Sequence, residues 1–341
     1  MRCPTLSELP PPPPGKTGWP WTEESSPCEP SVTDGREWPR ISIVTPSFNQ
    51  GQFIEATLRS VLLQGYPNLE YLVLDGRSTD NSVEVINKYS PWLTYWASEP
   101  DSGQSDAINR GLKRASGTFA TWINSDDMLC RSALRNHALR IGFEKKTVYV
   151  GNCYYLDESG NTISSHCGRV HSLEDLVRIR TVWRAGAQII QPEVLFPLEL
   201  ALEVGGLNTG NYYSMDFELW GEFFLAGATF EYTNVDFGMF RTHAAQKTQD
   251  GLGRTQSLVD AAERLVARAH FLSHETKNEI LADLGAYAKA YPTQYWRSSG
   301  RLARIGLPRG IVLRLRSLAA AFQKRARSWP AKRANGSGAC L

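Results

Sequence analysis

The sequence has no charge-free run of about 18 apolar residues, so it predicts no membrane-spanning helix. The opening stretch MRCPTLSELPPPPPGK lacks the apolar core of a signal peptide, and we therefore expect no classical secretion. The six cysteines are scattered without paired spacing, which is typical of free thiols in a reducing compartment rather than of a disulfide framework. These absences favour a cytoplasmic protein.

Acidic residues are absent after Asp283, although twelve of the 37 Lys and Arg residues lie there. The last 58 residues carry a formal net charge of +12, whereas the chain through Asp283 carries −10. Within this basic tail, residues 310–327 have helical periodicity, with an apolar face beside several arginines. We therefore expect residues 301–330 to bind an anionic membrane surface, and we regard nucleic acid as the less favoured partner. The alternative is a helix that stays solvated or packs on the folded domain.

The N-terminal segment differs in composition from the rest of the chain. About half of the 19 prolines lie within residues 1–38, including the run from Pro10 to Pro14. The segment has neither helical nor strand periodicity. It therefore predicts a disordered or polyproline arm.

From Arg40 onward, short apolar runs alternate with amphipathic stretches. The pattern predicts strands at 41–45, 69–74, 93–97 and 119–123, with helices between them at 53–63, 82–89 and 105–114. Such alternation is typical of an α/β fold with a mostly parallel, Rossmann-like sheet and flanking helices. The motif Gly-x-Gly-x-x-Gly is missing after the first strand, which argues against a dinucleotide-dependent oxidoreductase.

After residue 145 the pattern is less regular. We expect a hairpin through 148–164, a strand near 187–190, helices at 198–204 and 214–225, a strand at 229–235 and a helix pair through 253–284. No internal repeat is visible.

Polar clusters follow three of the predicted strands, at residues 46–49, 75–80 and 124–127. Because ligands of such sheets bind beyond the carboxyl ends of the strands, we expect the three clusters to line one crevice. In the third cluster, Asp126 and Asp127 are adjacent carboxylates, and such hard oxygen ligands suit Mg²⁺ or Mn²⁺ that also holds a diphosphate. The alternative is that one of them caps the helix that follows.

Several segments resemble the family-2 glycosyltransferases of the GT-A fold. They are ISIVTPSFNQGQFIEATLRSVLLQGYPNLEYLVLDGRSTD, SEPDSGQSDAINRGLKRASG and FATWINSDD, followed by QPEVLFPLELALEVGGLN and YYSMDFELWGEFFLAG. The segments occur in the order and at the approximate spacing of that family. The resemblance covers residues 40–243.

The resemblance implies a site for a nucleotide-sugar donor, which we expect to be UDP-linked. It assigns to the nucleotide sugar Pro46, Phe48, Asn49, Asp75, Asp106, Asn109, Asn124 and Ser125, and to a divalent metal, Mn²⁺ or Mg²⁺, Asp126, Asp127 and His243. Asp75 is assigned to the base, since a carboxylate accepts a hydrogen bond from an imide N–H. The alternatives remain open that Asp75 is a turn residue, that Asp106 and Asn109 form an exposed helical face, and that His243 is structural.

The resemblance also implies that Asp216 is the catalytic base of an inverting transfer, with Glu218 as its substitute. The alternative is that Asp216 is an ordinary acidic residue at a helix N-terminus. Three positions depart from the family's pattern. Asn124 replaces the first acid of the Asp-x-Asp motif, and Ile108 replaces an arginine. Met215 replaces the first acid of the acidic pair that opens the helix of the catalytic base. These departures put in doubt the diphosphate geometry and the donor.

We therefore expect an inverting glycosyltransferase that moves a sugar to a hydroxyl of a sugar or lipid-linked acceptor, in polysaccharide or glycan biosynthesis. The alternative is a catalytically degenerate GT-A scaffold whose basic tail binds membrane or nucleic acid. The expected organisation is a disordered arm at 1–38, a GT-A catalytic domain at 39–250 and a basic helical extension at 251–341. The membrane-binding tail would place the protein peripherally on the inner face of the membrane.

Overall fold

A computed structural model describes residues 3–29, 31–32, 35–142, 144–247 and 251–290 of the chain. Contacts between residues group positions 1–290 into one compact unit. The predicted helix at 310–327 and the predicted membrane-binding region at 301–330 lie outside the described residues. No helix within the described ranges is long and apolar enough to cross a membrane.

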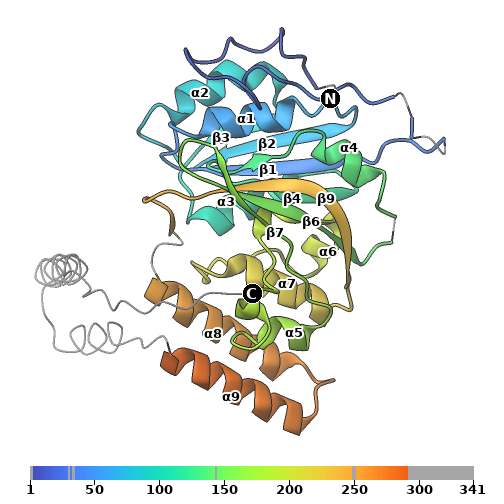
Figure 1. The fold of residues 1–341 in the computed structure, drawn as a ribbon, viewed down its shortest axis with the longest axis vertical. Helices are drawn as coiled ribbons and strands as arrows, with labels where there is room; N and C mark the ends of the chain where they lie inside the picture. The colour runs from blue at the N-terminus through green and yellow to red at the C-terminus, as the bar shows by residue number, and fades with distance from the viewer. Residues whose placement is uncertain (1–2, 30, 33–34, 143, 248–250, 291–341) are drawn as a thin grey trace, which may run out of the picture. The chain divides into compact units, whose positions relative to one another are not determined.

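The first half of the sheet is parallel, as the alternating pattern predicts (Figure 1). Its strands run in the order β3-β2-β1-β4, with β1 at Ile41–Ser47, β2 at Leu69–Asp75, β3 at Tyr95–Ser98 and β4 at Phe119–Trp122. The crossover helices are α1 (Ile54–Leu62), α2 (Ser82–Tyr89) and α3 (Gln104–Arg114). The register pairs Ser47 with Asp75, so the carboxyl ends of β1 and β2 lie side by side.

The second half of the sheet has mixed strand directions. It contains β5 (Met128–Leu129), β6 (Thr147–Leu156), β7 (Thr162–His166), β8 (Val194–Pro197) and β9 (Thr229–Arg241). β8 pairs antiparallel with both β4 and β6, and β9 pairs parallel with β6. The strand expected near 187–190 lies instead at β8, and β9 is longer than predicted because it continues past a register shift opposite Asn152.

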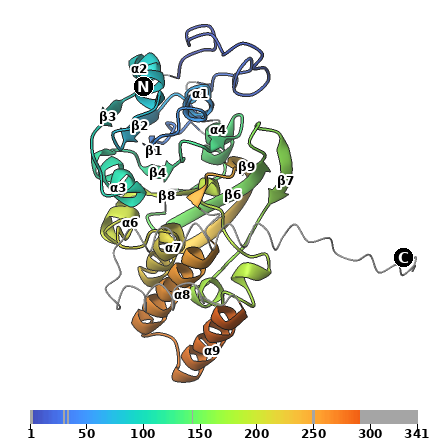
Figure 2. The same ribbon diagram turned by 90° about the vertical axis from the view of Figure 1, so that its left-hand side faces the viewer.

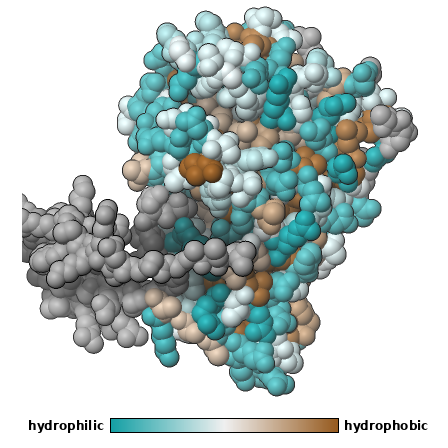
Figure 3. Space-filling view, viewed as in Figure 1, coloured by the Kyte–Doolittle hydropathy of each residue, from teal (hydrophilic) through white to brown (hydrophobic). Residues whose placement is uncertain are grey.

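Helices and irregular segments cover both faces of the sheet (Figure 2). Alternate residues of β1 point to opposite faces, so Ile41 and Ile43 pack in the core beneath α1 while Val44 packs in the core that includes α3. The remaining helices are α4 (Ala133–Ala138), α5 (Leu173–Val177), α6 (Leu198–Glu203), α7 (Met215–Leu225), α8 (Gly251–Arg268) and α9 (His274–Ala290). Figure 3 shows apolar residues as separate spots on a mainly hydrophilic face.

Helices α8 and α9 belong to the same compact unit as the sheet, so the packing shows no boundary at residue 250, where we expected one. α8 packs on α7 so closely that a Cβ on Gly221 would lie 2.2 Å from Leu265 Cδ1. Leu265 and Ile280 are buried in the core that α7 also enters. The helix pair therefore completes this core rather than forming a separate appendage.

The N-terminal segment also differs from the prediction, because residues 3–29 lie as a strap against the domain instead of forming a disordered arm. Its contacts centre on Arg59 of α1, which is 0% exposed. The Arg59 guanidinium donates hydrogen bonds to the carbonyl oxygens of Pro10, Pro20 and Trp21 at 2.8, 3.0 and 2.9 Å. Proline-rich sequence lacks periodicity, but its carbonyl groups are good acceptors for a buried guanidinium.

We expect Arg59→Met to lower the free energy of unfolding by about 2–4 kcal/mol, because it leaves several buried carbonyl oxygens without a donor. Denaturant unfolding measures this change, and limited proteolysis should show new cleavage within residues 3–29. Arg135→Met, on the exposed side of α4, is the matched control and should have little effect. Equal unfolding midpoints for the two variants would contradict the role given to Arg59.

Candidate functional site

A cavity of about 790 Å³ opens at the carboxyl ends of β1 and β4. Two of the three predicted polar clusters line it, through Pro46, Ser47 and Phe48 at the end of β1 and through residues 124–127 after β4. The cluster after β2 contributes Gly76. The parallel strands therefore bring these segments together as expected. A volume of this size is in the range that holds a small-molecule ligand.

The loop after β4 is held in place by the buried carboxylate of Asp127. Asp127 Oδ1 accepts a hydrogen bond from the Arg241 backbone N–H at 3.0 Å, and Oδ2 accepts one from Asn124 Nδ2 at 3.0 Å. Burial and the neighbouring charge of Asp126 raise the pKa of Asp127 well above its ordinary value. Both Asp127 oxygens are thus engaged within the protein.

Asp126 is oriented differently and meets a histidine from the end of β9. His243 Nε2 lies 3.0 Å from Asp126 Oδ2, and the imidazole packs on Phe53 with ring centroids 4.6 Å apart. A carboxylate oxygen and an imidazole nitrogen are both suitable metal donors, and Mg²⁺ or Mn²⁺ needs few protein ligands when a diphosphate and waters supply the others. Asp126 and His243 could therefore hold a divalent cation, whereas both Asp127 oxygens already accept hydrogen bonds within the protein. The described residues contain no group of three His, Cys, Asp or Glu side chains that could hold a metal by itself.

Asp216 stands at the start of α7 and lines the same cavity. Its Oδ1 accepts a hydrogen bond from the Phe217 backbone N–H at 2.8 Å. Burial raises the pKa of Asp216 above its ordinary value, although the charges of Arg254 and Lys247 oppose this rise. A carboxyl group with a raised pKa is a better proton acceptor once ionised.

Glu218, the expected substitute for Asp216, is committed to other contacts. Arg264 donates to both of its oxygens at 2.9 Å, and Asn208 and Asn211 donate at 3.1 and 2.6 Å. Burial alone would raise the pKa of Glu218, but these hydrogen bonds lower it below its ordinary value. Glu218 thus anchors α7 to α8 and to the loop before α7.

Asp75 and Asn49 lie beside the cavity but not among its lining residues. Asp75 accepts hydrogen bonds from the Ser78 N–H and hydroxyl at 2.9 and 2.5 Å and from the Ser98 hydroxyl at 2.7 Å. Asn49 has a positive φ of 53° and accepts from the Thr79 N–H at 2.8 Å. In this structure both side chains stabilise the turn after β2, and Asp75 also lines a second, smaller cavity beside β3 and α3.

Asp106 and Asn109 of α3 are likewise not brought into the cavity. Asp106 forms an ion pair with Arg110 at 2.8 Å. Asn109 exchanges two hydrogen bonds of 2.8 Å with the backbone of Leu207, and a Cβ on Gly206 would lie 2.4 Å from Asn109 Oδ1. Asn109 therefore joins α3 to the turn after α6.

The three departures from the family's pattern have structural explanations. Asn124 Oδ1 accepts from Gln104 Nε2 at 2.7 Å, so the neutral side chain links α3 to the loop after β4. Ile108 is 0% exposed in the core, where an arginine would be costly. The Met215 sulfur accepts a hydrogen bond from the Ser105 hydroxyl at 2.9 Å.

The cavity is also lined by three basic residues that the sequence patterns do not indicate, Lys247, Arg184 and Arg254. Lys247 Nζ donates to Gln104 Oε1 at 3.1 Å and lies 3.8 Å from the centroid of the Tyr212 ring. Burial lowers the pKa of Lys247 to about 8, although the charge of Asp216 opposes this change. Only the position of Lys247 shortly after Arg241-Thr-His243 could have drawn attention to it.

Residues 42–186 match the family model described as glycosyl transferase family 2. An uncharacterized glycosyltransferase of Rickettsia prowazekii is 23% identical over 265 residues, covering 74% of this chain and 80% of the relative. An uncharacterized glycosyltransferase of Mycobacterium tuberculosis is 39% identical over 90 residues, which are 26% of this chain. That match spans 34%, about a third, of the mycobacterial protein's length.

Solved structures with a similar fold include S. aureus TarS 1-349 in complex with UDP-GlcNAc, at 16% identity and a TM-score of 0.55 over 74% of this chain and 73% of that chain. Another is the mannosyltransferase PcManGT from Pyrobaculum calidifontis in complex with GDP-Man and Mn²⁺, at 20% identity and a TM-score of 0.53 over 85% and 83% of the two chains. At these identities the likeness establishes the fold. Residues 42–186 therefore match glycosyl transferase family 2, and the chain has the GT-A fold.

Proposed function

We propose that the protein transfers a sugar from a nucleotide-diphospho-sugar to an acceptor hydroxyl with inversion at the anomeric carbon. The observation that carries this proposal is that Asp216 and Asp126, the partner of His243, line one cavity at the strand ends. Asp126 and His243 suit the diphosphate side of a donor, and the position of Asp216 suits a general base. The likeness to a UDP-GlcNAc complex supports a UDP-linked donor.

The donor's nucleotide would lie along Pro46, Phe48 and the loop of Asn124 and Ser125, which line the cavity. Phe48 is 59% exposed, so its ring is accessible for contact with a base or ribose. Asp75 and Asn49 would contact the donor after the turn that they now stabilise rearranges. Asp106 and Asn109 would contribute to donor binding by holding α3 in place. These assignments follow the sequence resemblance.

Asp126 and His243 would hold Mn²⁺ or Mg²⁺ together with the donor's diphosphate. When bound, the cation would supply positive charge that stabilises the departing nucleoside diphosphate. The complex of PcManGT with Mn²⁺ supports this choice of ion. Lys247, on the same cavity, would add a second positive charge.

Asp216 would accept the proton of the acceptor hydroxyl as the hydroxyl oxygen attacks the anomeric carbon. The new glycosidic bond forms while the bond from that carbon to the diphosphate oxygen breaks, so the nucleoside diphosphate leaves from the opposite face. A single displacement of this kind inverts the anomeric configuration. The raised pKa of Asp216 favours proton transfer to it.

We expect the wild-type chain to bind UDP more tightly with Mn²⁺ than without it, and Asp126→Ala to lose this difference, because the variant lacks the carboxylate of the proposed metal pair. Titration calorimetry measures both affinities. Asp260→Ala, which removes a carboxylate of α8, is the control and should keep the Mn²⁺ dependence. If wild-type protein bound no nucleoside diphosphate under any condition, the degenerate-scaffold alternative would be favoured.

We expect Asp216→Asn to keep donor binding but to lower kcat by about 10²- to 10⁴-fold, since removal of a general base has this typical cost. In the wild type, kcat should fall as the pH drops through the raised pKa of Asp216, because only the ionised carboxylate accepts the proton. The variant's residual activity should lose this acidic limb.

The matched control is Glu218→Gln, the same acid-to-amide change two residues away. It should lower thermal stability through the lost ion pair with Arg264 and reduce kcat far less than Asp216→Asn. The opposite ranking of the two variants would assign the base to Glu218.

A further inference from the structure

Aromatic side chains form a large part of the cavity wall. They include Tyr155, Trp183, Tyr212, Tyr213 and Phe240. Aromatic rings offer broad apolar faces on which a sugar ring can lie, and few polar groups then set its orientation. This lining suits a carbohydrate bound beside Asp216.

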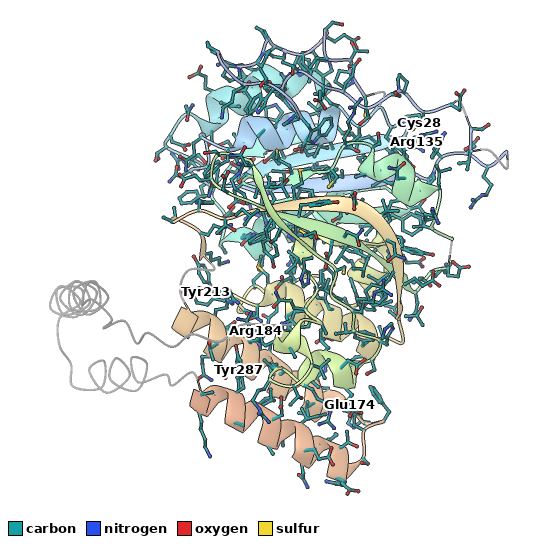
Figure 4. All side chains as sticks on the ribbon, viewed as in Figure 1. Cys28, Arg135, Glu174, Arg184, Tyr213 and Tyr287 are labelled. Atoms are coloured by element: carbon teal, nitrogen blue, oxygen red, sulfur yellow. The ribbon has the colours of Figure 1, made fainter. Side chains whose placement is uncertain are left out.

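Two arginines line the same cavity from segments far apart in the chain. Arg184 lies in the short 3-10 helix Trp183–Ala185, and Arg254 lies in the first turn of α8. Both side chains line the same cavity, and burial and the charge of Arg184 lower the pKa of Arg254. In Figure 4, Arg184 lies near α8.

Placing two like charges on one wall costs free energy, which an anion between them would offset. Arg184 donates to Gln188 Oε1 at 3.3 Å, a neutral partner. Among the residues that the structure describes, no ion pair with a carboxylate is formed by Arg184. The charge of Asp216 acts on Arg254. Arg254 therefore lies within electrostatic reach of the proposed base, and Arg184 lines the same cavity.

We propose that Arg184 and Arg254 form a subsite for an anionic group of the acceptor, a carboxylate or a phosphate ester carried by an acceptor sugar. The sugar ring would lie on the aromatic wall with its nucleophilic hydroxyl at Asp216. This inference rests on the proposed function and specifies its acceptor class. The forked guanidinium of arginine suits both carboxylate and phosphate oxygens.

The experiment uses the full chain, with and without saturating UDP and Mn²⁺, and three probes. D-glucuronate carries a carboxylate, glycerol 3-phosphate carries a phosphate, and D-glucose is the neutral reference. Saturation-transfer NMR titrations give the affinities. We expect at least one anionic probe to bind about tenfold or more tightly than D-glucose, as a charge-assisted hydrogen bond implies. The preferred probe identifies the anion as a carboxylate or a phosphate.

Arg184→Gln should lower the affinity for the preferred anionic probe by about tenfold or more while leaving the affinities for D-glucose and UDP unchanged. Arg140→Gln removes the same charge from an exposed position outside the cavity and should leave every affinity unchanged. Equal binding of anionic and neutral probes, equal losses in both variants, or displacement of the anionic probe by UDP would overturn the proposal. The last result would assign the arginines to the donor's diphosphate.

The outcome for the anion subsite can be distinguished from the outcome for the proposed function. The probes are titrated into UDP-free protein as well, so anion binding is measured even if UDP does not bind. Failure of UDP to bind would overturn the proposed donor site, whereas failure of the anionic probes with normal UDP binding would overturn the acceptor subsite alone.

Discussion

The buried carboxylate of Asp127 connects the segments on which the geometry of the cavity depends. The two carboxylate oxygens accept hydrogen bonds from the Arg241 backbone N–H and from the Asn124 side chain. The main-chain carbonyl oxygen of Asp127 accepts one from the Thr57 hydroxyl at 2.6 Å. The loop after β4 is thereby joined to α1 and to the end of β9. A buried carboxylate without such partners would be strongly destabilising, so the three segments are held together. As a result, Asp126, the residue just before Asp127, faces His243.

The two halves of the sheet serve different parts of the cavity. The parallel half ends in loops that carry the residues of the proposed donor site. The mixed half directs β9 toward these loops, and the chain after it supplies His243 and Lys247. Asp216 lies in the first turn of α7. The position of α7 depends on Glu218, whose ion pair with Arg264 joins α7 to α8. The helices after β9 therefore contribute to the geometry of the site as well as to the core.

The parts of the structure that could be predicted from sequence are those governed by local patterns. The apolar runs of β1, β2 and β4 are short and β-branched, and the clusters after β1 and β4 line the cavity because parallel strands end together. The contacts of Asn109 and of Arg59 could not be predicted, since each depends on backbone atoms distant in the sequence. Likewise, nothing in the periodicity of residues 183–190 indicates that Arg184 lines one cavity with Arg254, 70 residues further along the chain.

The N-terminal strap has a consequence for the order in which the protein can be assembled during synthesis. The strap is translated before the partners that hold it: Arg59 binds Pro10, and the Trp19 indole N–H donates to the Leu129 carbonyl oxygen at 2.9 Å, 110 residues away in the chain. The strap must therefore stay solvated until β5 has been translated. Its richness in proline suits this interval, because a proline-rich chain has few backbone donors with which to pair prematurely.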